Sequence, residues 1–399
     1  MINQLSNIKT QSPKIASGLG FRYDIKYSSK KRGVDKGMIK HWQGFIIKVT
    51  LILSAVIILT PTTSLAKSIS KQQTGAIRQR LQQANANALV LVGKGKHPTI
   101  ISNQAIINGH QASAINPQQL FPIASFQKTI TGIAIQQLIN RHQLSLDTKL
   151  NRYLPEVTNS EQITIRQLMM HTSGLADVNR IAPQPLTSEK ANWQFTMHNY
   201  RVRSQPGQWH YANVNYGLLA IVVAKASHQS YQRYVQKYIF NYYNLPNLKF
   251  FTQTSASRVV PSLTAAQHHR LDPSEKNNWR YLQREMSAEY GAGQVLATPQ
   301  GYWQLMQKTL LNHHGIGHQY HHIHFQPNDN PYYGGIYIHQ NAIHANGSYA
   351  GYACTLFADY KTKKVLILFS NNITLKQCRQ LGHDLDQIYF GSNHQAFPY

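Results

Sequence analysis

The sequence predicts a mixed α/β fold in which helices flank one antiparallel sheet built from both ends of the mature chain. Two runs rich in Val and Ile, typical of strands, come early, at residues 88–93 and 99–108. From Gly335 three more follow, GGIYIHQ, GYACTLFAD and KKVLILFSNN, and a last helix fits 375–389. Between about 140 and 285 the pattern indicates helices joined by Pro- and Gly-containing loops. Strands at both ends with a helical middle favour a single sheet beside a mostly helical inserted subdomain.

The first 66 residues predict an export signal. They carry ten basic and two acidic residues, a net charge of +8, and an apolar run, VTLILSAVIILT, over 49–60. This run is shorter than the ~20 residues of a membrane-spanning helix and suits the core of a signal peptide. Small side chains at Ser64 and Ala66 favour cleavage before Lys67, and an uncleaved anchor is the alternative.

We therefore expect three segments: a basic N-terminal region with a secretory signal over 1–66, a polar lead-in over 67–86, and a folded domain over 87–399. The lead-in is rich in Gln and is either flexible or a surface helix. Met38 begins a stretch that alone has ordinary signal length, so translation from Met38 is a further hypothesis. The protein is expected to be secreted and to associate with a bacterial wall or membrane surface.

The charge of the chain restricts its partners. Its 399 residues include 40 Lys and Arg against 15 Asp and Glu, a formal charge of +25, of which +17 falls on residues 67–399. Such an excess favours nucleic acid, an anionic membrane surface or an anionic polymer as partner. A secretion signal and the lack of any nucleic-acid-binding motif argue against nucleic acid. We expect an anionic wall polymer or membrane surface.

The strongest catalytic candidate is Ser125-Phe126-Gln127-Lys128 at the start of a predicted helix, SFQKTITGIAIQQLINRH. A serine hydroxyl is a weak nucleophile until a base removes its proton. Residues three apart on a helix share a face, which places the Lys128 amine beside the Ser125 oxygen. The helix start adds N–H groups that stabilise negative charge during attack.

Two further motifs complete the candidate site. In Tyr211-Ala212-Asn213, the phenol can relay protons and the Asn213 amide can hold both a lysine and a substrate. In the late strands, HANGS places the small Gly347 where a substrate backbone can lie against a strand. The N–H of Ser348 would pair with that of Ser125 as an oxyanion hole.

These motifs together resemble the β-lactamase-related serine hydrolases, which include penicillin-binding proteins of the D-alanyl-D-alanine carboxypeptidase type and class C β-lactamases. The resemblance covers most of residues 85–390, and its most specific part is ITIRQLMMHTSGL, followed by PGQWHYANVNYGLL and GAGQVLATPQ. It implies a β-lactamase/transpeptidase-like fold, with Ser125 as acylated nucleophile and Lys128 as its base. It also implies that Tyr211 shuttles protons, that Asn213 binds Lys128 and the substrate amide, and that a β-lactam is a covalent ligand.

The third motif departs from the family pattern, which has Lys-Thr-Gly or His-x-Gly on the strand. Counting back from Gly351-Tyr352 aligns Gly347 with the family glycine and leaves Ala345 at the Lys or His position. Only a one-residue shift would bring His344 into that role. The missing Lys makes an ester or amide substrate without a free carboxylate more plausible.

Two remaining features invite a functional interpretation. Six histidines gather in NHHGIGHQYHHIH, over 312–324, but without nearby acids or cysteines we expect a surface loop and no metal site. Cys354 and Cys378 are the only cysteines, and their spacing neither requires nor excludes a disulfide. No metal or organic cofactor is expected.

The sequence thus predicts a secreted serine hydrolase that acts on D-alanyl groups of the bacterial cell wall through an acyl-serine. Peptide D-Ala-D-Ala and D-alanyl esters on teichoic acid compete as substrates. A β-lactamase or general esterase of the same fold is one alternative, and a non-catalytic protein that binds penicillin or wall fragments is another.

Overall fold

The computed structural model describes residues 69–263, 278–392 and 394, and all structural statements below concern these residues. The chain divides into two units, Met1–Ala66 and Lys67–Tyr399. The predicted signal lies outside the described residues and stays a prediction, as does the start at Met38.

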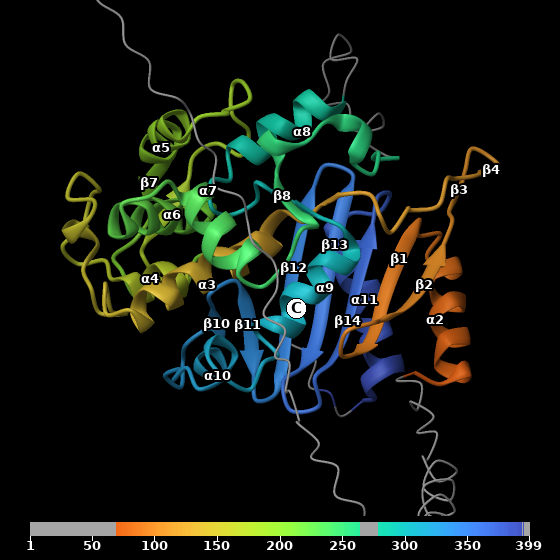
Figure 1. Ribbon diagram of the computed structural model, residues 1–399. Helices are drawn as coiled ribbons and strands as arrows, with labels where there is room; N and C mark the ends of the chain where they lie inside the picture. Colours follow the sequence, from red (N-terminus) through yellow and green to blue (C-terminus); the bar gives the residue numbers. More distant parts are fainter. Residues whose placement is uncertain (1–68, 264–277, 393, 395–399) are drawn as a thin grey trace, which may run out of the picture. The chain divides into compact units, whose positions relative to one another are not determined.

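A seven-stranded antiparallel sheet forms the centre of the second unit, with the strand order β10-β11-β12-β13-β14-β1-β2 (Figure 1). Strands β1 and β2 come from the beginning of the unit, and the other five strands come from its end. This confirms the expected sheet built from both ends of the chain. The strands are β1 Ala88–Lys94, β2 Thr99–Asn103, β10 Tyr332–Tyr333, β11 Ile336–His339, β12 Ala342–Tyr349, β13 Tyr352–Asp359 and β14 Lys364–Ser370.

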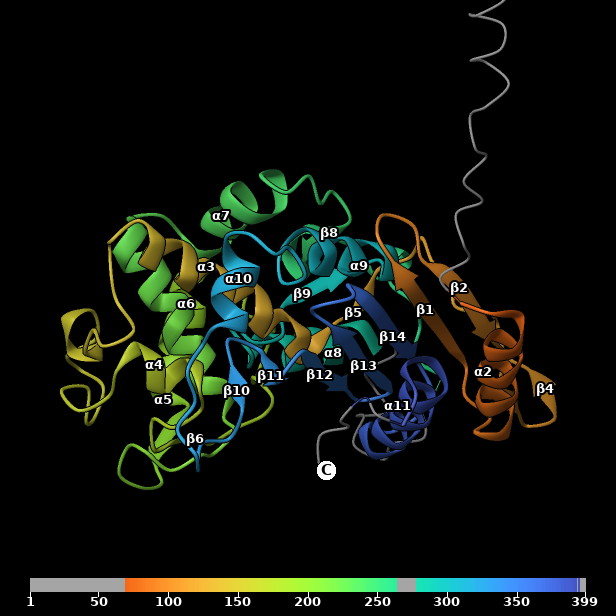
Figure 2. The same ribbon diagram turned by 90° about the horizontal axis from the view of Figure 1, so that it is seen from below.

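The two faces of this sheet bury different clusters, because side chains alternate along each strand. On β1, Val90 and Val92 face helices α2 (Lys71–Gln83) and α11 (Leu375–Phe390), whereas Leu89 faces the main core. Figure 2 shows α2 and α11 close together at one end of the unit. The lead-in predicted over 67–86 therefore contains a surface helix, the second of its two expected forms.

The helical subdomain lies against the other face and contains the catalytic elements. Its central helices are α3 (Gln127–Asn140) and α6 (Asn213–Ser227), and α6 is apolar and buried on nearly all sides, as expected of a helix packed inside a protein. The remaining helices are α4 Ile165–Met169, α5 Glu189–His198, α7 Tyr231–Val235, α8 Asn278–Ser287, α9 Pro299–Lys308 and α10 Ile316–His321.

Further short strands lie outside the central sheet. They form three small sheets, β3 Ile106–Ile107 with β4 His110–Gln111, β6 Leu175–Asp177 with β7 Tyr200–Val202, and β5 Phe121–Pro122, β9 Val295–Ala297 and β8 Leu248–Phe250 in the order β5-β9-β8. The single strand expected over 99–108 is therefore wrong in its second half, where β3 turns back on β4.

One local expectation needs correction, and one question that the sequence left open is answered. The histidine-rich stretch 312–324 is not a loop throughout, because α10 occupies its middle. Cys354 and Cys378 are free and buried, and they do not form a disulfide. The physical reason is strand alternation: Cys354 faces the main core, whereas Cys378 lies in the cluster on the opposite face of the sheet.

Within the described ranges, no helix has both the length and the apolar character needed to cross a membrane.

Candidate active site

Ser125 lies in a short 3₁₀ turn, Ala124–Phe126, that leads directly into α3. Its neighbours Ala124 and Phe126 are fully buried and fix the turn in the core. Ala124 has a φ of 45°, a left-handed conformation that costs a side-chain-bearing residue of the order of 1–3 kcal/mol. The surrounding packing therefore holds the nucleophile in a backbone conformation that the chain would otherwise avoid.

Lys128 lies one helical turn beyond Ser125 and is completely buried. Its Nζ donates to Ser125 Oγ at 2.9 Å and to Asn213 Oδ1 at 2.7 Å. Burial lowers the pKa of Lys128 from 10.5 to about 8, while the carboxylates of Glu289 and Asp177 oppose this shift. A lysine with this pKa is partly neutral near pH 7–8, so it can accept the proton of the serine.

Tyr211 reaches the same oxygen from the loop before α6. Its hydroxyl donates to Ser125 Oγ at 2.8 Å, and its ring lies 4.9 Å from Lys128 Nζ. Burial raises the pKa of Tyr211, so the phenol keeps its proton and serves as a donor. The buried ring of His171 packs against it with centroids 4.3 Å apart. We did not single out His171 from the sequence, although it lies within the recognised stretch ITIRQLMMHTSGL.

Asn213 is held at the first position of α6 by an acid that the sequence did not reveal. Asp177 of β6 accepts from the main-chain N–H of Asn213 at 2.8 Å and of Val214 at 2.7 Å. A carboxylate at a helix start satisfies free N–H groups and complements the helix dipole. Asp177 precedes Asn213 by 36 residues, so no local pattern links the two.

Strand β12 forms the opposite wall of the site. Gly347 packs against the nucleophile turn so closely that a Cβ added there would lie 2.5 Å from Ile123 O and 3.3 Å from Ser125 N. Only glycine fits this approach. β11 pairs with β12 as far as His344, so the stretch 345–349 extends past the last pair on that side. Such an edge of a sheet can pair with an extended substrate.

A cavity of about 440 Å³ opens between the two walls. It is lined by all the predicted site residues except Lys128, which is buried beneath the serine, and His344. The lining residues are Ser125, Asp177, Arg180, Trp209, Tyr211, Asn213, Glu289, Tyr332, Gly335, Tyr337, Ala345, Asn346, Gly347, Ser348, Leu375 and Arg379. The structure thus brings together residues from both ends of the unit and from its helical middle.

The proposed shift to His344 is wrong. Its ring packs on Phe357 at 4.5 Å, and its Nδ1 lies 2.9 Å from the carbonyl oxygen of Leu356. Burial lowers the pKa of His344 to about 3, so the ring is neutral and cannot replace a lysine. Ala345, one residue along, is the residue that lines the cavity.

The mouth of the cavity is basic and partly aromatic. Arg180 and Trp209 line it. Arg201 and Arg203 are exposed on the neighbouring segment, where Arg201 pairs with Ala176 next to Asp177. Burial lowers the pKa of His210, and both arginines lower it further. Among the described residues, none of the three arginines forms an ion pair. Another cavity, of about 520 Å³ between α5 and α7, is lined by Glu189, Tyr231, Ser230 and Lys237, and no hydrogen bond joins that serine and lysine among the described residues.

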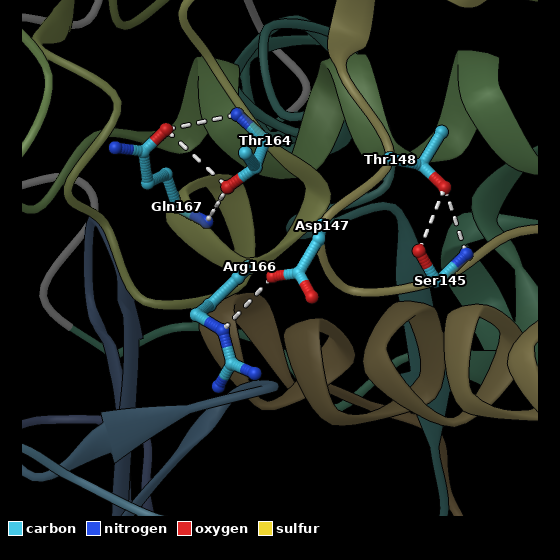
Figure 3. Close-up of polar contacts among 6 residues, drawn as sticks. All are labelled: Ser145, Asp147, Thr148, Thr164, Arg166 and Gln167. Atoms are coloured by element: carbon cyan, nitrogen blue, oxygen red, sulfur yellow. Dashed lines mark hydrogen bonds and ion pairs between the residues drawn. The ribbon is translucent and has the colours of Figure 1, made fainter.

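The recognised stretch around α4 has a structural role beside the site (Figure 3). Thr164 and Gln167 form a reciprocal cap at the start of α4, with Gln167 N donating to Thr164 Oγ1 at 3.2 Å. Arg166 Nε lies 3.8 Å from Asp147 Oδ1 in an ion pair, and Ser145 N donates to Thr148 Oγ1 at 2.8 Å. These contacts fix the loop and helix that lead to His171.

No group of three His, Cys, Asp or Glu residues suited to a metal ion occurs among residues 69–263, 278–392 and 394.

Comparisons with known proteins identify the family and the fold. A family model described as Beta-lactamase matches residues 76–385. PbpX of Bacillus subtilis is 25% identical over 279 residues, which cover 69% of this chain and 67% of the relative. The crystal structure of FmtA from Staphylococcus aureus superposes with a TM-score of 0.64 at 18% identity, over 82% of this chain and 89% of FmtA. The crystal structure of the β-lactamase/D-alanine carboxypeptidase of Yersinia pestis superposes with a TM-score of 0.64 at 17% sequence identity. The match covers 82% of this chain and 98% of the Yersinia protein. The chain belongs to the β-lactamase family of serine hydrolases.

Proposed function

We propose that this hydrolase removes D-alanyl groups from a polymer of the bacterial cell wall through an acyl-Ser125 intermediate. The observation that carries the proposal is the hydrogen-bonded set of Ser125, Lys128, Tyr211 and Asn213, with contacts of 2.7–2.9 Å, at a cavity bounded by a strand edge. Those contacts bring a base and a proton donor to one oxygen and hold the base through the Asn213 amide.

The chemistry follows from these contacts. Neutral Lys128 takes the proton of Ser125 as Oγ attacks the acyl carbon, and the N–H groups of Ser125 and Ser348 receive the resulting oxyanion. Collapse of this intermediate breaks the bond to the leaving oxygen or nitrogen, which takes a proton from Tyr211, and Lys128 returns a proton to Tyr211. Water then attacks the acyl-serine by the reverse route and releases D-alanine.

Two features favour an ester on an anionic polymer over a dipeptide. Ala345 leaves β12 without the cation that would hold a substrate carboxylate. Arg201 and Arg203, exposed beside the mouth, suit a chain of phosphates, which teichoic acid offers. The cations that do line the cavity, Arg180 and Arg379, would meet phosphates next to the leaving group. This proposal places the folded domain outside the cell, as the signal-like segment 1–66 predicts.

The test measures D-alanine release by the purified protein from D-alanylated lipoteichoic acid and from an acyl-D-Ala-D-Ala peptide, and p-nitrophenol release from a p-nitrophenyl ester. We expect release from the polymer and the small ester. Reversing both charges with Arg201→Glu and Arg203→Glu should raise KM for the polymer roughly tenfold at low salt and leave the small ester unchanged. The matched control reverses Lys71 and Arg78, two exposed cations on α2 far from the mouth.

Release from the dipeptide alone would instead identify a carboxypeptidase, with an arginine of the cavity holding the carboxylate. No release from any of the three, together with no covalent labelling by penicillin, would favour the non-catalytic binding protein.

A further inference from the structure

Glu289, like Asp177, is a polar residue of the site that neither the sequence motifs nor the family pattern singled out. It follows α8, and its main-chain carbonyl accepts from the N–H groups of Ala292 and Gly293, both at 2.8 Å, which fixes the turn that carries it. Its side chain lines the cavity beside Asn213. A buried carboxylate needs hydrogen-bond donors, and Asn213 and Tyr349 supply them here.

The two oxygens of Glu289 are held by different walls of the site. Oε1 accepts from Asn213 Nδ2 at 3.0 Å, and Oε2 accepts from the hydroxyl of Tyr349, at the end of β12, also at 3.0 Å. Tyr349 has one hydroxyl proton, which is shared between Glu289 Oε2 and Gly293 O, the latter at 2.6 Å. The carboxylate therefore joins the helical wall to the strand wall behind the nucleophile.

This contact determines which way the Asn213 amide faces. An asparagine has one accepting end and one donating end, whereas an ionised carboxylate only accepts. With Nδ2 on Glu289, the oxygen Oδ1 must point to Lys128 Nζ, where it accepts at 2.7 Å. A flipped amide would set two acceptors against each other and two donors against each other.

We propose that Glu289 is a positioning residue that, through Asn213, holds Lys128 Nζ against Ser125 Oγ. The inference rests on the acyl-serine chemistry proposed above and adds to it the group that orients the base. Glu289 acts without touching the reacting atoms, so its removal disturbs the site in two separable ways, by geometry and by charge.

The effect of the Glu289 charge on the pKa of Lys128 depends on the other charged groups around these two residues. Glu289 faces Lys128 of α3, Asp177 of β6, Tyr349 of β12 and Glu285 of α8, and its pKa is raised by burial and lowered by Lys128. Its carboxylate and that of Asp177 both raise the pKa of Lys128.

The aromatic groups around Lys128 carry no charge that competes with Glu289. The rings of Tyr211 and Tyr216 lie 4.9 and 5.7 Å from Nζ, and His171 has a pKa lowered by burial. Loss of the Glu289 charge therefore lowers the pKa of Lys128, so the base becomes neutral at lower pH.

The experiment follows the rate of Ser125 acylation by a fluorescent penicillin from pH 5.5 to 10 in the full protein. Glu289→Gln keeps an acceptor for Asn213 but removes the charge. We expect its plateau rate to stay within about tenfold of wild type and the midpoint to move roughly one pH unit lower. Glu289→Ala removes the acceptor as well, and we expect its plateau to fall about 100-fold.

Glu189→Gln is the matched control. Glu189 is also a half-buried carboxylate, which accepts from Tyr290 Oη at 2.9 Å and from Tyr231 N at 2.8 Å, but it does not contact Asn213. Its variant should keep both the plateau and the midpoint of the wild type.

The proposal is overturned if Glu289→Ala keeps the wild-type plateau, or if Glu289→Gln keeps the wild-type midpoint. If Glu289→Ala does not fold, as thermal unfolding would show, the midpoint of Glu289→Gln decides alone. A wild-type protein that neither penicillin nor an activated ester acylates would overturn the acyl-serine chemistry itself, which is a different result from an unchanged variant.

Discussion

The two walls of the cavity are built in different ways. The helical wall places charged and polar side chains, and Lys128, Tyr211 and Asn213 are tied into one network around Ser125 Oγ. The strand wall presents small residues, with Ala345 and Gly347 close to the nucleophile turn.

This difference separates chemistry from recognition. The helical wall brings together the serine, lysine, tyrosine and asparagine that the family resemblance implies. The strand wall departs from those motifs at the position that would contact a substrate carboxylate. Changes on the helical wall should therefore alter the rate with every substrate, whereas changes at Ala345 should alter which substrate is preferred.

The largest expected effect is on the helical wall. Lys128→Ala removes the base, and acylation by any substrate should slow by about 10²–10⁴-fold. Stopped-flow labelling with a fluorescent penicillin and turnover of a p-nitrophenyl ester should report the same loss. A loss confined to one of the two substrates would show that Lys128 recognises substrate and does not serve as the base.

The wild-type pH profile tests the same wall without a mutation. Because burial brings the pKa of Lys128 to about 8, the acylation rate should rise with pH and reach half its plateau near pH 8. The lysine is the acceptor of the proton, so its neutral form, which dominates above that pH, is the active one. A rate that is flat between pH 6 and 9 would contradict this role.

The strand wall is tested first at Gly347, where β12 lies closest to the turn that carries Ser125. In Gly347→Val the new side chain meets Ile123 O and Cys354 Sγ, 2.5 and 2.9 Å from the added Cβ, so β12 must move away from Ser125. A misplacement of about 1 Å costs about 100-fold in rate, and we expect that loss in kcat for the small ester. A variant with full activity would show that the strand does not set the position of the nucleophile.

Recognition by the strand wall is tested with Ala345→Lys, which restores a cation at the family position. We expect the preference between an acyl-D-Ala-D-Ala peptide and a D-alanyl ester, as the ratio of kcat/KM values, to shift roughly tenfold toward the peptide. An unchanged ratio would mean that the carboxylate is read elsewhere in the cavity.

The smallest effect on activity is expected at His344. His344→Phe should keep kcat/KM within about twofold, because the ring packs on Phe357 and meets the cavity only through Asn346, whose Nδ2 lies 2.9 Å from His344 Nε2. Stability should respond instead: the folded pKa of about 3 lies below the ordinary 6.5, so His344 costs stability as pH falls from 6.5 toward 3. The variant should lose less stability over that range in urea titrations, and a curve parallel to wild type would contradict the burial argument.

Much of the helical wall could be predicted because its signals are local. Ser125 and Lys128 lie three residues apart on one helical turn, and Tyr211 and Asn213 flank the start of a strongly apolar helix. Asp177 and Glu289 could not be found this way. They reach Asn213 across 36 and 76 residues, and nothing in their immediate neighbourhoods marks them.

The strand wall could have been predicted better than it was. Side chains alternate along a strand, so Ala345 shares the face of Gly347, whereas His344 shares the face of Asn346 and Ser348. Ala345 is therefore the residue that faces the same way as Gly347. The same alternation separates Cys354, which faces the main core, from Phe357, which faces α11. The register of β12 with β13 carries this information, and spacing along the sequence does not.

The central claim is that Ser125 is the acylated nucleophile of this network. Its most direct test is intact mass spectrometry of the protein after incubation with penicillin, followed by peptide mapping. We predict one added acyl group, located on Ser125, and none on Ser125→Ala. An adduct on another residue, or an equal adduct on Ser125→Ala, would contradict the claim.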